Sequence, residues 1–153
     1  MSTDYIVASL PTLAFDAPAP ITWEKFAETA PDAERFVASS GWNDLETQLR
    51  NAMAAARGGA KYERPADGCS LYWKNRVTTC FQEKDVAKRD EMIDRTWWDA
   101  AGELTPPSSP LGRGALATYA VRLKIALRRA KISKDAGTAA FDRLVAATRG
   151  SSV

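Results

Sequence analysis

Apolar residues recur at every third or fourth position along three long stretches of this 153-residue chain. That spacing places them on one face of an α-helix, whereas a half-buried strand would need strict alternation. The stretches cover residues 42–57, 83–103 and 115–131. They predict an all-α protein in which amphipathic helices pack around a common core.

The first stretch has the clearest ends. Trp42, Leu45 and Leu49 lie on its apolar face. Ser40 is placed to cap the start, and Gly58 follows at the position where glycine commonly terminates a helix. We therefore predict a helix over residues 42–57 with its stripe in the core.

The second stretch carries two adjacent tryptophans. Trp97 falls on the stripe that also contains Ile93 and Leu104, so it is expected in the core. Trp98 lies about 100° away around an ideal helix. It must therefore either cap the edge of the core or face a partner. The proline-rich segment 105–114 is predicted to be a loop that ends this helix.

The third stretch is apolar on two faces. Its core stripe includes Leu116, Leu123 and Leu127, whereas Val121 and Ile125 lie opposite, between edges that carry Arg122, Lys124 and Arg128. One interpretation places this helix near the middle of the bundle. The other makes Val121 and Ile125 part of a partner-binding surface ringed by arginine, a residue type enriched in interfaces.

Shorter segments complete the expected fold. Thr22 and Pro31 are placed to begin two short helices, and a separate last helix over residues 134–148 is predicted to follow Ser133 as its cap. Residues 5–15 fit either a short strand or a helical turn, and residues 59–82 show no clear period. The prediction is a single domain, residues 1–153, with five to six helices.

The residue types needed for most catalytic sites are missing. The chain has no histidine and two cysteines, Cys69 and Cys80, which rules out a zinc site of the usual Cys and His ligands and any histidine-dependent nucleophile. Phosphate-binding glycine motifs are also absent. Asp90 and Asp94 share a helix face, but interspersed Lys and Arg favour a solvated surface. We therefore expect no enzyme activity, metal or cofactor, and both thiols reduced.

Charge is divided unevenly along the chain. Residues 113–149 hold nine Lys and Arg against two Asp and Glu, whereas residues 1–112 hold 12 against 17. This asymmetry indicates either an acidic partner surface or an electrostatic match between the two parts. The overall pI of about 8.6 is low for a dedicated nucleic-acid-binding domain, so no nucleic acid is expected as a partner. Without a signal-like N-terminus, the chain is expected in the cytoplasm.

Several motifs resemble a known family. They are YIVASLP (5–11), LRNAMAAAR (49–57), MIDRTWWDAAGEL (92–104) and YAVRLKIALRRAKISKDAG (119–137). In this order they resemble a short bacterial family of unknown function. Its members are encoded among the subunits of V/A-type ATPases, in the place where the C-type funnel subunit is expected. The resemblance implies a reduced version of the helical fold of that funnel, which has no active site.

The implied role is that of a non-catalytic subunit or assembly partner of a rotary ATPase. Such a chain links the soluble head and central shaft to the membrane c-ring, at the inner face of the membrane, and meets the membrane only through its partners. The alternative is a cytosolic helical adaptor unrelated to the ATPase. The residues expected to contact partners are Arg50, Asn51, Val121, Arg122, Lys124, Ile125 and Arg128. For Arg50 and Asn51, helix capping or internal hydrogen bonding is the competing interpretation.

Overall fold

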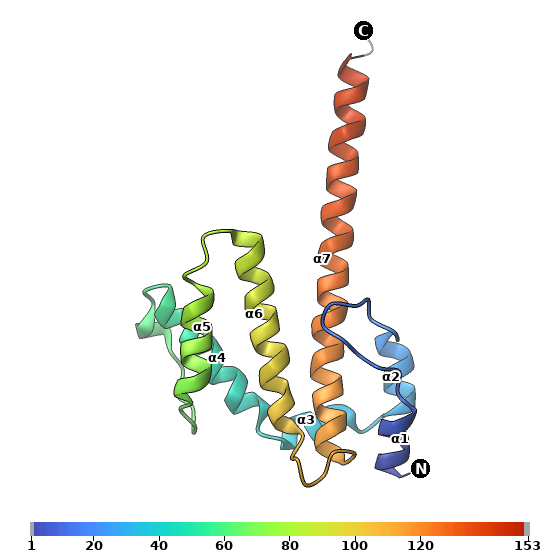
Figure 1. Ribbon diagram of the computed structural model, residues 1–153, viewed down its shortest axis with the longest axis vertical. Coiled ribbons are helices and arrows are strands. Elements are labelled where there is room, and N and C mark those ends of the chain that lie inside the picture. The colour runs from blue at the N-terminus through green and yellow to red at the C-terminus, as the bar shows by residue number, and fades with distance from the viewer. Residues whose placement is uncertain (1, 152–153) are drawn as a thin grey trace.

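The computed structural model describes residues 2–151, which form seven α-helices and no strand (Figure 1). The all-α prediction is confirmed, whereas the expected number of five to six helices is too low. None of the described helices is both long enough and apolar enough to cross a bilayer. The helices are α1 (Thr3–Ser9), α2 (Trp23–Thr29), α3 (Ala33–Ser39), α4 (Trp42–Ala56), α5 (Leu71–Cys80), α6 (Val86–Ala101) and α7 (Arg113–Ser151), with two 3-10 turns, η1 (Ala60–Tyr62) and η2 (Gly102–Leu104).

The helices form two groups that meet at α6 and α7. In the first group, α5 and α6 form a hairpin that packs on α4 (Figure 1). In the second, α1 and α3 pack against the N-terminal half of α7. The core lies where these groups meet, and its most deeply buried large side chains are Phe26, Leu49, Leu116 and Leu123.

Helix ends follow local sequence signals. The Thr22 hydroxyl accepts a hydrogen bond from the Lys25 backbone N–H at 3.2 Å, which caps α2 as predicted. Asp85 does the same for α6 by accepting from two backbone N–H groups, so this helix begins at Val86 rather than at residue 83. Gly58 has a φ of +79°, the left-handed conformation that ends α4 after Ala56.

The C-terminal region differs most from its prediction. The two helices expected over residues 115–131 and 134–148 are one continuous helix, α7. Ser133 lies in its interior and caps nothing, because no proline or left-handed glycine interrupts the chain there. A serine that favours a helix start is also tolerated within a helix, so composition does not distinguish the two cases.

The unassigned segment 59–82 contains a complete helix, α5. Its N-terminus is capped by Ser70, whose hydroxyl accepts from the Trp73 N–H at 3.4 Å. Trp73, Val77 and Cys80 form its buried face. These three residues are spaced four and three positions apart, a helical period that could have revealed α5 from the sequence. Residues 5–15, which fitted either a strand or a helical turn, begin in the helix α1.

The two tryptophans of α6 exchange their expected places. Trp98 is buried, with Phe15 against its ring at 5.6 Å between centroids, whereas Trp97 is only partly buried. The expectation that Trp97 is the core residue is therefore wrong. The apolar stripe identifies one face of α6, but Phe15 of the N-terminal loop and Arg122 of α7 cover Trp98 on another face.

Candidate functional site

An open groove of about 820 Å³ lies between α4, α6 and α7. Six of the seven predicted contact residues line it, although they come from segments about 70 residues apart in the chain. The exception is Arg122. The lining members of the predicted set are Arg50, Asn51, Val121, Lys124, Ile125 and Arg128.

The floor of the groove is apolar. Val121 and Ile125 are only 7% and 6% exposed and belong to the hydrophobic core, beside the partly buried Trp97. They are therefore not an outward-facing patch, as one interpretation of the sequence had it, because α7 lies between other helices at this point. A partner can reach them only from inside the groove.

The rim of the groove is basic, and most of its cations already have partners within the chain. Arg50 lies 3.5 Å from Glu46, one turn earlier on α4. Lys124 pairs with Glu34 at 2.6 Å and lies 4.8 Å from the centre of the Trp23 ring. These side chains are exposed, and exposed ion pairs stabilise a fold by less than about 1 kcal/mol. They are therefore available to exchange partners.

Asn51 has a structural role. Its side-chain N–H donates to the Arg64 carbonyl at 2.7 Å, and its carbonyl oxygen accepts from the Arg64 N–H at 2.8 Å. This pair of bonds holds the loop after η1 against α4. For Asn51, the alternative to partner contact was internal hydrogen bonding, and the isolated chain shows that bonding.

Asp94 lies at the inner edge of the groove and forms ion pairs with Arg128 and with Arg129, the latter at 3.4 Å. Burial raises the pKa of the Asp94 carboxyl above its ordinary value, although the two guanidinium groups and a hydrogen bond from Arg129 act in the opposite direction. The carboxylate therefore carries its charge in an unfavourable, poorly solvated place.

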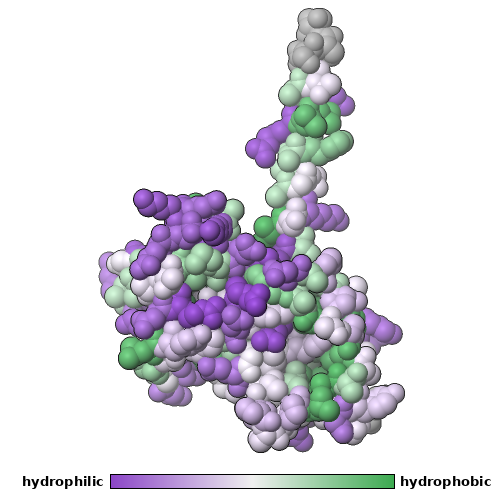
Figure 2. Space-filling view, viewed as in Figure 1, coloured by the Kyte–Doolittle hydropathy of each residue, from purple (hydrophilic) through white to green (hydrophobic). Residues whose placement is uncertain are grey.

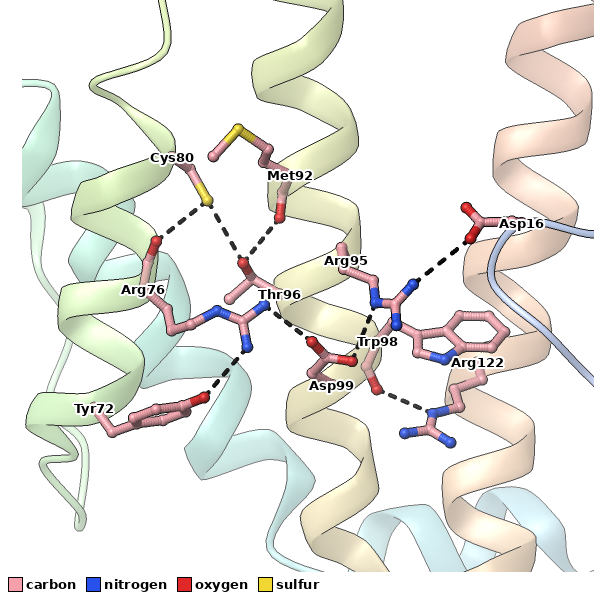
Figure 3. A network of polar contacts seen from close by, with 10 residues as sticks. All are labelled: Asp16, Tyr72, Arg76, Cys80, Met92, Arg95, Thr96, Trp98, Asp99 and Arg122. Atoms are coloured by element: carbon pink, nitrogen blue, oxygen red, sulfur yellow. Dashed lines mark hydrogen bonds and ion pairs between the residues drawn. The ribbon is translucent and has the colours of Figure 1, made fainter.

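Arg122 lies outside the groove, and its side chain contacts Trp98 of α6 instead (Figure 3). Its Nε–H donates to the Trp98 carbonyl at 3.0 Å, and its guanidinium lies 5.3 Å from the centre of the Trp98 ring. Burial lowers the pKa of this guanidinium, against the attraction of nearby Asp99. These contacts join α7 to α6 and give Arg122 a structural role that the sequence did not indicate.

The polar network around Arg122 continues across α6 (Figure 3). Asp99 accepts hydrogen bonds from Arg76 of α5 at 3.0 Å and from Arg95 of α6 at 3.3 Å. Arg95 also lies 3.9 Å from Asp16 in the N-terminal loop. Each member has a partner in a neighbouring segment, so the network fastens α5, α6 and the N-terminal loop together.

The two cysteines are both free thiols. Cys69 is exposed, and Cys80 is buried with its sulfur 3.2 Å from the Arg76 carbonyl. Within residues 2–151, no group of three or more His, Cys, Asp or Glu side chains is close enough to hold a metal ion.

A second candidate surface is the C-terminal part of α7, which rises beyond the rest of the chain (Figure 1). Residues 130–144 are all exposed. They include three large apolar side chains, Ile132, Phe141 and Leu144, which are 59%, 65% and 66% exposed. Apolar patches along this projecting helix are visible in Figure 2. The sequence indicated a helix here, but not that its apolar residues lack a covering element.

Comparison with known proteins gives no relative. No protein-family profile matches the chain, and neither the curated proteins nor the solved structures contain a significant match.

Proposed function

We propose that this chain is a non-catalytic protein-interaction subunit, and that it serves a V/A-type rotary ATPase as a reduced form of the C-type funnel subunit or as an assembly partner. In this role it links the soluble head and central shaft to the membrane c-ring and meets the membrane only through those partners. The family resemblance of the motifs in residues 49–57, 92–104 and 119–137 supports the choice of assembly.

The observation that carries the interaction role is the projecting part of α7. At 1.5 Å per residue, this 39-residue helix is about 58 Å long. Its last part exposes Phe141 and Leu144 on adjoining positions of one face. Most helical stability in proteins comes from tertiary packing of an apolar face, and this face has no such packing within the described chain. A partner that covers it supplies the missing stabilisation.

The alternative is a helical adaptor unrelated to the ATPase. The projecting helix favours both roles equally, because it indicates a partner without specifying which one. The identity of the captured proteins distinguishes the two.

The test is a tagged pull-down from gently solubilised native membranes, with mass spectrometry of the bound proteins. Wild-type chain is compared with the double variant Phe141→Glu/Leu144→Glu. The matched control is Ala139→Glu/Ala146→Glu, because each alanine lies two residues, or about 200°, from its counterpart on the same helix. All four positions are in the exposed part of α7, so every variant is expected to keep the fold.

Recovery of the A, B, D and c-ring subunits in fixed proportion by wild type and control, but not by the Phe141/Leu144 variant, supports the proposal. Recovery of one different protein with the same dependence supports the adaptor. Equal recovery by all three chains contradicts the role of the projecting helix.

A further inference from the structure

We propose that the groove between α4, α6 and α7 binds an acidic amphipathic helix of a partner protein. This inference goes beyond the proposed function, since it concerns a separate surface and holds whichever assembly the chain serves. It combines the apolar floor of the groove with the charge of its rim. Amphipathic helices commonly bind such grooves, with apolar anchors spaced at i, i+3, i+4 and i+7.

The floor provides the apolar half of the match. It is formed by Ile93 and Trp97 of α6 and by Val121 and Ile125 of α7. Val121 and Ile125 belong to the hydrophobic core, and Trp97 packs against it. Side chains that enter the groove therefore meet a preformed surface, which lowers the cost of ordering on binding. The groove volume lies within the range of roughly 300–1,000 Å³ usual for ligand pockets.

The rim provides the charge. Five cationic residues line the groove against two carboxylates, Glu46 and Asp94. The surplus favours a partner with several carboxylates. The cationic residues are Arg50, Arg57, Arg64, Lys124 and Arg128.

The positions of the cations match the repeat of a helix rather than a single compact anion. Arg50 and Arg57 are seven residues apart, two turns along one wall of α4, and Lys124 and Arg128 are one turn apart on α7. Cations placed along two walls pair with carboxylates on both flanks of a helix that lies between them. A phosphate site would instead gather its donors at one point, and no glycine-rich loop does so here.

The same charges disfavour two other occupants. The projecting helix of a second copy carries Lys131, Lys134, Arg143 and Arg149 against Asp135 and Asp142, so its net charge has the same sign as the groove. A single-stranded nucleic acid is held by several exposed aromatic rings on which successive bases stack. The groove offers one strongly exposed ring, Tyr62, whereas Trp42 is buried and Trp97 is only partly exposed, so successive bases have no series of rings to stack on.

The test measures binding of designed peptides by titration calorimetry. The probe is a helical peptide of about 18 residues, a length that permits partial helix formation in water, with Leu at i, i+3, i+4 and i+7 spacing and Glu on both flanks. The matched probe has Lys in place of every Glu. The protein variant Arg50→Glu/Arg57→Glu reverses one wall of the rim, and Arg57→Glu/Arg64→Glu is a second reversal. The control Lys74→Glu/Lys84→Glu changes two exposed lysines outside the groove.

The Glu peptide is expected to bind wild type and control equally, and both rim reversals at least about tenfold more weakly. The Lys peptide is expected to bind the reversals better than it binds wild type. Binding of the Glu peptide is also expected to weaken as salt is raised.

Three results overturn the proposal. The first is equal binding of the Glu and Lys peptides to wild type, or no binding of the Glu peptide. The second is binding of a thymidine oligonucleotide that the rim reversals abolish, which assigns the groove to nucleic acid. The third is a wild-type dimer in sedimentation experiments that the reversals dissociate, which assigns it to a second copy.

Discussion

Asn51 and Arg64 are joined by two reciprocal hydrogen bonds. The side-chain amide of Asn51 donates to the backbone carbonyl of Arg64 and accepts from its backbone N–H. This pairing fixes the course of the loop between η1 and α5 along α4. We expect Asn51→Ala to lower the free energy of unfolding by about 1 kcal/mol, since solvent-exposed hydrogen bonds of this kind contribute modestly. Urea denaturation measures the change.

The loop itself provides a second readout of the Asn51 contact. Limited proteolysis is expected to cleave Asn51→Ala faster within residues 58–70, because the backbone is no longer fixed there. Asn43→Ala is the control, since Asn43 is an exposed asparagine on the same helix. Equal cleavage of both variants would show that the loop is held by other contacts, such as the Asp44 carboxylate that accepts from the Asp67 and Gly68 N–H groups.

Replacement of Arg122 tests whether it is structural. Arg122→Met keeps much of the length of the side chain but removes the hydrogen bond to Trp98 and the guanidinium over its ring. We expect the free energy of unfolding to fall by about 2 kcal/mol, because both lost contacts involve a partly buried charge. Arg128→Met, on the exposed rim, is expected to cost less than about 1 kcal/mol. Equal losses would place Arg122 among the surface residues.

The stability of the chain is expected to depend on the protonation of Asp94. Its pKa is raised in the folded state, so this group stabilises the fold at a pH below its ordinary pKa of 3.8, and that contribution is lost as the pH rises through the folded value. The stability of wild type relative to Asp94→Asn should therefore fall as the pH increases from about 3 and become constant once Asp94 is ionised. Denaturation series for both chains measure it. A relative stability that rises with pH would mean that the ion pairs with Arg128 and Arg129 outweigh burial.

Replacing a glycine of α7 by alanine is expected to change stability in opposite directions at Gly137 and at Gly114. Outside the local backbone of α7, no atom lies within 4 Å of a Cβ added at Gly137, so Gly137→Ala should fit and favour the helix by up to about 1 kcal/mol. At Gly114, an added Cβ would overlap the Leu104 carbonyl oxygen, so Gly114→Ala should destabilise the fold by about 1–3 kcal/mol. Circular dichroism and thermal unfolding distinguish them. A stable Gly114→Ala would show that the turn between η2 and α7 can shift.

The burial of Val121 and Ile125 determines how acidic substitutions there should affect folding. If Val121 and Ile125 formed an exposed interface, Val121→Asp/Ile125→Asp would abolish assembly and leave the isolated fold intact. Because both side chains are buried, we expect the double variant to unfold, since two uncompensated carboxylates in the core cost several kcal/mol. Thermal denaturation is the measurement. A cooperative transition at the wild-type temperature would show that the groove floor tolerates solvent.

The sequence by itself determined the features that depend on neighbouring residues. The three- and four-residue spacing in residues 42–57, the capping hydroxyl of Thr22 and the left-handed Gly58 each act within one or two turns, so they could be recognised without a fold. For the same reason the all-α class was predictable, as was the presence of helix at both ends of α7.

Only the tertiary structure decided the features that depend on contacts between distant segments. Trp98 rather than Trp97 enters the core because Phe15 of the N-terminal loop and Arg122 of α7 pack against it. The loop before α5 shows no periodic apolar pattern in its sequence, because its backbone is held by side chains of α4, including Asn51 and Asp44, and not by apolar packing of its own. Val121 and Ile125 lie at the bottom of a groove instead of on a surface because α4 and α6 form its other walls. Burial is a property of the packed chain, and a helical period shows which residues share a face but not what covers it.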